Sequence, residues 1–231
     1  MKTYYSNINN FKESTQGMNG LEFEERYSSY LLRISEPMKK HILRFKFEDD
    51  RLRSLAGYIL VLDAIKSLKE ECKDETYKKL SNISFPIKID YEASGKPFLL
   101  DAPEISFSIS HSGSYAAIVI ASSDECNSIG IDIQAKDRFD VLKIAKRFYT
   151  DNENALINSA NTDSDKEDLF YKIWSAKEAF VKCDGKGLSY GISNFNADIT
   201  KGIITDLKDN TLASIYEQQC PDGYVCYVCT K

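Results

Sequence analysis

The chain has 231 residues, of which 42% are hydrophobic and 28% charged, and its formal net charge is −5. This composition is typical of a globular protein with a sizeable core, and the length fits one large domain or two small ones. The net negative charge argues against nucleic acid as the main partner, and no apolar run is long enough to cross a membrane.

The first residues contain no apolar signal segment, so we expect a cytoplasmic protein. Six scattered cysteines are too few for a disulfide framework. Cys226 and Cys229 form a CxxC pair, but one such pair without a second ligand pair is a weak zinc signal. The pair lies in a strand-like segment, which favours small core residues.

The first half of the chain combines helices with a few strands. Hydrophobic periodicity predicts a strand over 2–8, helices over 21–33, 38–45 and 49–69, and strands over 87–91, 98–100, 105–110 and 115–121. The helix 38–45 carries the densest basic cluster of the chain, Lys39, Lys40, His41 and Arg44, and the next helix has Arg51 and Arg53 near its N-terminus. Cations near a helix start can bind an anion, and plain surface solubility is the equally weighted alternative.

His111 follows the alternating strand 105–110 and is predicted to lie at a hairpin tip between Ser110 and Ser112. A buried structural role is not expected there. Ligand contact and simple exposure remain two comparable interpretations of this histidine.

Asp132 is the unusual residue of the next strand, predicted over 129–134. Three isoleucines at 129, 131 and 133 share one face, so Gly130, Asp132 and Gln134 must share the other. An acid in such an apolar strand requires a metal, a cationic partner or a capping hydrogen bond. We favour a metal, because the amide oxygen of Gln134 can add a second hard ligand.

Helices are predicted over 142–149 and from residue 153, a polar loop over 158–166, and strands near 195–199, 202–205, 214–218 and 224–229 that suggest a second antiparallel sheet. A faint internal repeat accompanies these elements. Arg44-Phe45-x-x-Glu48-Asp49 resembles Arg147-Phe148-x-x-Asp151-Asn152, and each motif comes just before a helix.

The segment 169–189 predicts one amphipathic helix around which the chain is organised. Its apolar stripe contains Leu169, Ile173, Ala176, Phe180 and Cys183. The opposite face carries Trp174, Glu178 and Lys182 at four-residue spacing, flanked by Lys177. An ordinary surface ion pair between Glu178 and Lys182 is the simpler interpretation. The lone tryptophan of the chain on this face, and the glycine-rich turn at 185–187, favour a site instead.

Five blocks in order resemble the signature of the Sfp-type 4'-phosphopantetheinyl transferases and span most of the chain. They are Gly95-Lys96-Pro97, Ser108-Ile109-Ser110-His111-Ser112-Gly113, Gly130-Ile131-Asp132-Ile133, Arg147-Phe148-Tyr149, and Trp174-Ser175-Ala176-Lys177-Glu178-Ala179 continued by Lys182 and 185–189. Each block alone is a weak signal, and their order and spacing together carry the resemblance.

The resemblance implies an α+β fold of two similar halves, a pseudo-dimer with the active site in the cleft between them, which we divide at residues 1–124 and 125–231. The implied reaction moves the 4'-phosphopantetheine arm of coenzyme A to a serine of an apo acyl or peptidyl carrier protein and releases 3',5'-ADP. By position, Asp132 and Glu178 would bind Mg2+. Lys182 would contact the pyrophosphate, Lys96, Ser110 and His111 would line the coenzyme A pocket, and Arg53 would contact the 3'-phosphate.

The chemistry of the residues agrees with this assignment. Neutralising a pyrophosphate needs a hard divalent ion and fixed cations, and a carboxylate such as Glu178 can take the serine proton. Many relatives have Glu where this chain has Gln134, so weaker metal binding is expected. A catalytically degenerate module that binds coenzyme A or a carrier protein is the alternative. A nucleotide phosphotransferase is disfavoured, because the glycines at 185–187 end a helix instead of preceding one. Two fused halves are expected to act as a monomer.

Overall fold

The computed structural model describes residues 1–18, 20–71, 80, 83–137, 140–185, 187 and 190–231. The chain forms two compact units. Unit 1 contains residues 1–92 and 97–125, and unit 2 contains residues 93–96 and 126–231. The short segment that includes Lys96 therefore packs with the C-terminal unit, although the chain on both sides of it belongs to the N-terminal one.

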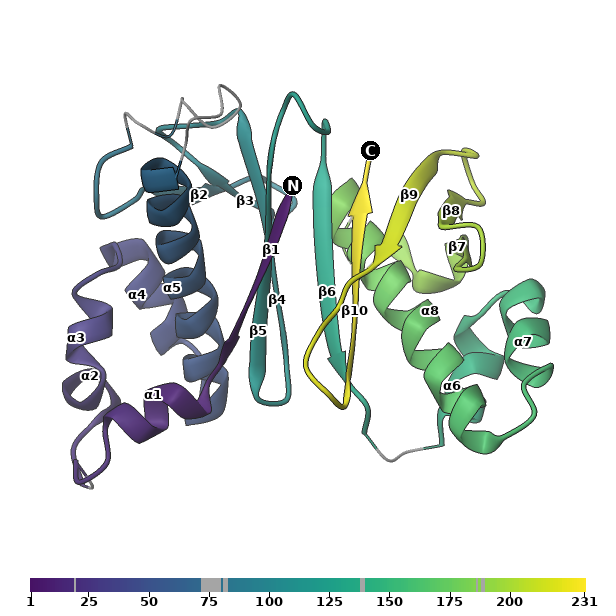
Figure 1. Ribbon diagram of the computed structural model, residues 1–231, viewed down its shortest axis with the longest axis horizontal. Coiled ribbons are helices and arrows are strands. Elements are labelled where there is room, and N and C mark those ends of the chain that lie inside the picture. The colour runs from purple at the N-terminus through teal and green to yellow at the C-terminus, as the bar shows by residue number, and fades with distance from the viewer. Residues whose placement is uncertain (19, 72–79, 81–82, 138–139, 186, 188–189) are drawn as a thin grey trace. The chain divides into compact units, whose positions relative to one another are not determined.

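Unit 1 is built on a three-stranded antiparallel sheet of order β1-β5-β4, with β1 at Lys2–Asn7, β4 at Ile105–Ser112 and β5 at Tyr115–Ser122. Strands β2 (Ile89–Tyr91) and β3 (Pro97–Leu99) form a separate pair. The long helix α5 (Glu48–Glu71) packs against the sheet (Figure 1). The described residues of unit 1 also form four shorter helices: α1 (Asn9–Ser14), α2 (Phe23–Arg26), α3 (Ser28–Leu31) and α4 (Glu36–Leu43).

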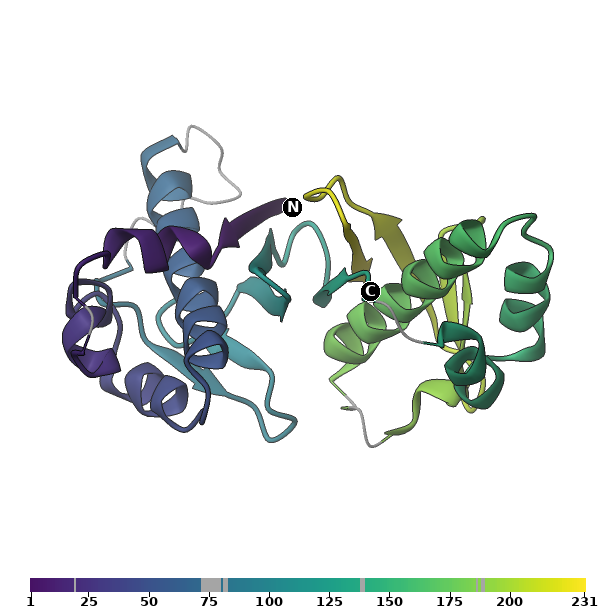
Figure 2. The same cartoon turned by 90° about the horizontal axis from the view of Figure 1, so that it is seen from below.

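Unit 2 has a five-stranded antiparallel sheet of order β6-β10-β9-β8-β7. Its strands are β6 (Ile129–Ala135), β7 (Phe195–Asp198), β8 (Ile203–Asp206), β9 (Leu212–Glu217) and β10 (Tyr224–Thr230). Helix α8 (Asp163–Asp184) lies across one face of the sheet (Figure 2). Helices α6 (Val141–Phe148) and α7 (Asp151–Asn158) pack on α8, and a short 3-10 turn, η3 (Ile192–Asn194), precedes β7.

The two units repeat one plan. In each, the first strand pairs with the last strand, the last pairs with the one before it, and the longest helix packs against these strands. Each unit has its own hydrophobic core, formed around α5 in unit 1 and around α8 in unit 2. The predicted α+β fold of two similar halves is therefore confirmed. The two copies of the faint sequence repeat lead into α5 and α7, which are not equivalent helices in this plan, since α8 is the counterpart of α5.

Two predicted elements differ from the structure. The helix expected over 21–33 is broken into α2 and α3, because the backbone leaves helical geometry at Tyr27, with φ −106° and ψ 20°. The loop expected over 158–166 contains the first turn of α8, where the Thr162 hydroxyl accepts a hydrogen bond from the backbone N–H of Asp165. The helix predicted within 169–189 ends at Asp184, as expected from the glycines that follow, since Gly185 takes φ 74°. Residues 186, 188 and 189 lie outside the described residues.

The other predicted strands and helices are found within a few residues of their expected bounds. Strand β4 continues through His111 to Ser112, so the histidine lies in the strand beside the turn instead of in the turn itself. Cys226 and Cys229 are both buried in β10, as expected for core residues. No helix in the described part of the chain is long and apolar enough to cross a membrane.

Candidate functional site

The candidate site in unit 2 depends on a very close approach of α8 to β6. Gly130 makes it possible, because a Cβ at this residue would lie only 2.1 Å from the carbonyl oxygen of Ala179 and 2.4 Å from the amide nitrogen of Cys183. The helix backbone thus rests directly on the strand. Asp132 and Gln134 share the strand face of Gly130, so this contact places them against the same helix.

Asp132 is 6% exposed and is held to α8 at two points. The Lys182 ammonium donates to its Oδ1 atom at 2.9 Å, and the Ser175 hydroxyl donates to its backbone carbonyl oxygen at 2.9 Å. Of the three partners that the sequence left open for this buried acid, the structure contains the cation. Lys182 thus bonds to the strand, and its charge also acts on Glu178 of its own helix.

Glu178 lies one turn before Lys182 on α8 and is partly buried. The pKa of its carboxyl group is raised to about 7, first by burial and then by the negative charge of Asp132, while the Lys182 ammonium opposes the shift. The charge of Asp132 thus acts on Glu178, and Lys182, one turn further along the helix, bonds to Asp132. The structure therefore brings together Asp132, Glu178 and Lys182, three residues that the sequence placed in one site.

Gln134 lies beside Trp174. Both residues line a cavity of about 120 Å³ together with Ile144, Phe170 and Tyr171. The Trp174 ring stacks on Phe170, with ring centroids 6.0 Å apart, and the Gln134 side-chain amide donates to the carbonyl oxygen of Ala135 at 3.3 Å. The Trp174 ring thus lines a cavity beside the strand face that carries Asp132, as its position on the polar face of the helix suggested.

Lys96 belongs to unit 2 and contacts the C-terminal end of α8. Its ammonium donates to the Ser128 hydroxyl at 2.7 Å and to the carbonyl oxygen of Cys183 at 3.3 Å. Since Lys182 directly precedes Cys183, the described contacts place two cations near the last turn of the helix.

The remaining predicted residues belong to unit 1. Arg53, in the second turn of α5, donates to the carbonyl oxygen of Gly113 at 2.9 Å, which places its guanidinium at the β4–β5 turn. Strand β4, which leads into this turn, carries Ser110, which is buried, and His111, which is exposed. Arg53 also pairs with Asp50 at 2.5 Å. Arg53 and the end of β4 therefore form a second polar cluster.

The basic residues of α4 do not act as one cluster. Lys39 pairs with Glu36 at 2.6 Å. His41 stacks on Tyr91, with centroids 5.9 Å apart, and its pKa is lowered by burial and by the charge of Arg44. A histidine packed among aromatic rings and kept neutral is a poor ligand for a phosphate.

Lys177 was expected to flank the polar face of α8, and this prediction was wrong. The side chain is fully buried, and its ammonium pairs with Glu153 at 2.6 Å, where the carboxylate side chain is 1% exposed. Burial lowers the pKa of Lys177, and the charge of Glu153 opposes this shift. A signal existed in the sequence, since Ile173, Ala176, Lys177 and Phe180 follow the i, i+3, i+4, i+7 pattern of a buried stripe.

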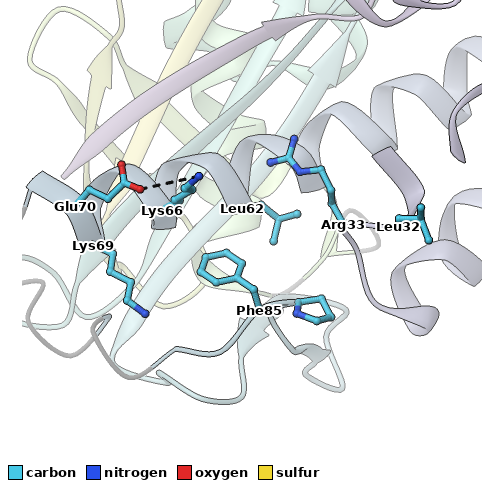
Figure 3. Close-up of a pocket in the computed structure, with 8 residues that line it drawn as sticks. Leu32, Arg33, Leu62, Lys66, Lys69, Glu70 and Phe85 are labelled. Atoms are coloured by element: carbon cyan, nitrogen blue, oxygen red, sulfur yellow. Dashed lines mark ion pairs between the residues drawn. The ribbon is translucent and has the colours of Figure 1, made fainter. Parts of the chain in front are cut away.

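A larger cavity, of about 640 Å³, lies in unit 1 away from every predicted site residue (Figure 3). Its lining residues are Leu32, Arg33, Leu62, Lys66, Lys69, Glu70, Phe85 and Pro86. Lys66 faces Glu70 at 4.0 Å, and Arg33 pairs with Asp63. The charged side chains that line this cavity are largely paired, and its other lining residues are apolar. The cavity therefore offers no chemistry comparable to that of the Asp132 site.

Two carboxylates and a fixed ammonium on one helix–strand face are typical of enzymes that act on phosphate esters and anhydrides. Comparison with known families agrees. Residues 128–229 match the family described as the 4'-phosphopantetheinyl transferase superfamily, and residues 23–125 match the description "4'-phosphopantetheinyl transferase, N-terminal". This chain belongs to the 4'-phosphopantetheinyl transferase superfamily and is an enzyme of that class.

Individual relatives extend the match over most of the chain. The 4'-phosphopantetheinyl transferase Sfp of Bacillus subtilis (strain 168) is 32% identical over 90% of this chain and 85% of its own length. The 4'-phosphopantetheinyl transferase psf-1 of Bacillus pumilus is 31% identical over 81% of this chain and 75% of its own. Among solved structures, the holo-[acyl-carrier-protein] synthase of Thermotoga maritima aligns with 44% of this chain and 61% of its own, at 18% identity and a TM-score of 0.33.

Proposed function

We propose that this enzyme transfers the 4'-phosphopantetheine arm of coenzyme A to a serine hydroxyl of an apo acyl or peptidyl carrier protein, in a magnesium-dependent reaction that releases 3',5'-ADP. Family membership supports the reaction class. The observation that carries the proposal is the shared position of Asp132, Glu178 and Lys182 between β6 and α8.

The donor atoms suit Mg2+. Asp132 and Glu178 supply carboxylate oxygens, and repulsion between their charges raises the pKa of Glu178 beyond the effect of burial. A divalent cation would relieve this repulsion. Among the described residues, no group of three or more His, Cys, Asp or Glu side chains could hold a metal. Two carboxylates completed by water and substrate phosphate oxygens are the usual ligand set of Mg2+.

Asp132 and Glu178 would hold the ion, and Gln134, on the same strand face, is the third proposed ligand. When bound, Mg2+ supplies positive charge to the pyrophosphate oxygens of coenzyme A. Lys182 is already fixed by Asp132 at 2.9 Å, so its ammonium needs little reorganisation to stabilise the departing phosphate.

Glu178 is the proposed general base. A serine hydroxyl is a poor nucleophile until its proton is removed, and a carboxylate beside the proposed metal site can accept that proton. We propose that Glu178 takes the serine proton directly or through one water while Asp132 keeps its bond to Lys182.

Coenzyme A contacts are assigned to residues in both units. Lys96 and Lys182 would bind phosphate groups, and Arg53 would bind the 3'-phosphate. Ser110 and His111 would line the pocket near the β4–β5 turn, to which Arg53 is hydrogen-bonded. These assignments rest on position in the family pattern and on the cationic or polar character of each side chain.

The direct test is incubation of the protein with coenzyme A, Mg2+ and an apo carrier protein. The proposal predicts a mass gain on one carrier serine and equimolar 3',5'-ADP. Binding of coenzyme A without either product would favour the degenerate binding module instead.

A matched pair of variants tests the role of Glu178. Glu178→Gln removes the base and one ligand charge and should lower kcat at least about 100-fold, the usual contribution of a general base. Glu167→Gln changes an exposed glutamate on the same helix and should leave the rate unchanged. A near-normal rate in Glu178→Gln would refute the assignment.

A further inference from the structure

Two buried thiols at the end of α8 take no part in the proposed transfer. Cys183 lies in the last turn of the helix and is 2% exposed, and Cys229 lies in β10 and is 0% exposed. Both are reduced in the structure. They are 46 positions apart in the chain, yet the strand register of unit 2 and the close approach of α8 to β6 bring them together.

The first feature is the strand register. Cys229 lies directly opposite Gly130 in the β6–β10 ladder, and opposite residues of an antiparallel pair project to the same face of a sheet. On that face Gly130 has no side chain, and a Cβ there would lie 3.0 Å from the Cα atom of Cys183. The Cys229 side chain therefore projects from the sheet next to Gly130, where the helix backbone at Cys183 contacts the strand.

The second feature is the interaction of the two thiols, which lowers the pKa of Cys183 and raises that of Cys229. A disulfide needs Cβ atoms about 3.5–4.5 Å apart. The close approach of the helix backbone at Cys183 to Gly130, the residue opposite Cys229, brings the two cysteines near each other.

The third feature is an asymmetric electrostatic setting. The hydrogen bond from Cys229 lowers the pKa of Cys183, burial opposes this, and the Ser128 hydroxyl and the charges of Lys96 and Lys231 lower it further. The same hydrogen bond, together with burial, raises the pKa of Cys229. Cys183 is thus the better nucleophile of the pair, since thiolates and not thiols attack sulfur.

We propose that Cys183 and Cys229 form a redox-active dithiol that a low-molecular-weight disulfide converts into an intramolecular disulfide. The Cys183 thiolate attacks one sulfur of the small disulfide and displaces the other half as a thiolate, which takes up a proton. Cys229 then loses its proton and attacks the Cys183 sulfur, which releases the second half of the reagent as a thiol. Two protein thiols are oxidised, and one small disulfide is reduced to two thiols.

The bond would join the end of α8 to β10 next to groups that we assign to substrate. Lys182 immediately precedes Cys183, and Lys96 donates to the Cys183 carbonyl oxygen. This consequence rests on the proposed function. If α8 shifts toward β10 as the sulfur atoms bond, both ammonium groups move, and transfer activity should fall at least tenfold in the oxidised protein and return with dithiothreitol.

The test uses the full chain and oxidised glutathione, followed by alkylation in denaturant and peptide mapping, and needs no transfer substrate. The wild-type protein should lose two alkylatable thiols and yield a linked peptide containing Cys183 and Cys229. Cys229→Ser should stop at a glutathione adduct on Cys183, and Cys183→Ser should give neither product at these two positions.

Cys226→Ser is the matched control, because Cys226 is buried in the same strand three residues earlier and projects to the opposite face. This variant should form the Cys183–Cys229 link as the wild type does. A link that involves Cys126, Cys220 or Cys226 in place of this pair, or failure of Cys183 and Cys229 to oxidise, would overturn the proposal whether or not the protein is a transferase. Full activity of the linked protein would overturn only the effect on transfer.

Discussion

Gly130→Ala is the substitution that most directly tests how the site is held. The added methyl group would lie 2.1 Å from the carbonyl oxygen of Ala179, so α8 would have to withdraw by about 1.3 Å to restore an ordinary 3.4 Å contact. The neighbouring atoms are helix backbone, which cannot move one atom at a time. Overpacking usually costs about 1–3 kcal/mol, and this rigid contact belongs at the upper end of that range.

A loss of about 3 kcal/mol corresponds to a fall in Tm of about 6 to 12 °C for a chain of this size. The same displacement moves Glu178 and Lys182 away from Asp132. Misplacement of catalytic groups by about 1 Å can lower the rate about 100-fold, and we expect a decrease of that order in kcat. Calorimetry measures the first effect, and carrier-protein modification well below the new Tm measures the second.

Gly57→Ala is the matched control. Gly57 is also buried, in α5, but its added Cβ would meet only the side chain of Ile109, at 2.7 Å, and that side chain can adjust. Alanine also favours the helix by about 1 kcal/mol, so the change in Tm should be small. If Gly130→Ala kept the wild-type Tm and kcat, the close contact between helix and strand could not be what positions the acid pair.

Three further predictions concern other residues. Arg53→Ala should raise the KM for coenzyme A about 10- to 100-fold, which corresponds to the loss of one charge-assisted hydrogen bond. The KM for 3'-dephospho-coenzyme A should not change. Equal effects on both substrates would contradict the 3'-phosphate assignment. Gln134→Glu adds a negative charge to the proposed ligand set and should lower the Mg2+ concentration that gives half-maximal activity, and an unchanged requirement would count against ligation. Burial raises the pKa of Tyr149 well above its usual value. Below about pH 10 the Tyr149 hydroxyl is neutral in both the folded and the unfolded chain, and its contribution to stability is complete. As the pH rises further, this tyrosine ionises first in the unfolded chain, so the contribution is lost. Tyr149→Phe should therefore lose less Tm between pH 8 and 10.5 than the wild type or the exposed Tyr216→Phe control, as measured by thermal scans at both pH values.

The alternation of β6 allowed the central part of the site to be predicted. Isoleucines at every second position left Gly130, Asp132 and Gln134 on one face, and helical spacing placed Glu178 and Lys182 together on α8. These are local periodicities, so they can be read without knowledge of the tertiary structure. They predicted which side chains share one face of β6 and which share one face of α8. The candidate site was predicted by assuming that these two faces meet.

Partners between distant segments could not be predicted in the same way. The bond from Lys182 to Asp132 depends on how closely α8 approaches β6, which is set by a glycine that periodicity treats only as a gap. The break between α2 and α3 depends on the backbone conformation of a single residue, Tyr27. The early start of α8 depends on the Thr162 cap, and a cap energy of about 1 kcal/mol is easily outweighed by packing. The general pattern was therefore predictable, and the contacts that join segments were not.

The buried ion pair of Lys177 and Glu153 is a contact between distant segments that helps to hold α8, the helix that carries Glu178 and Lys182, in place. Besides Lys177, Glu153 accepts hydrogen bonds from the amide nitrogens of Ala197 at 2.7 Å and Thr150 at 2.8 Å, so one carboxylate ties α7 and β7 to α8. Lys177→Met would leave that carboxylate buried without its cation, and such losses usually cost about 3–5 kcal/mol.

The same reasoning predicts partial rescue by a second substitution. Adding Glu153→Gln to Lys177→Met removes the buried charge and keeps one oxygen to accept from a backbone amide, so the double variant should be more stable than Lys177→Met alone in urea unfolding. Glu167→Gln on the exposed side of α8 is the control and should give no rescue. If both second substitutions lowered stability equally, the pair would not be coupled, and the orientation of Glu178, the next residue of the helix, would have to depend on other contacts.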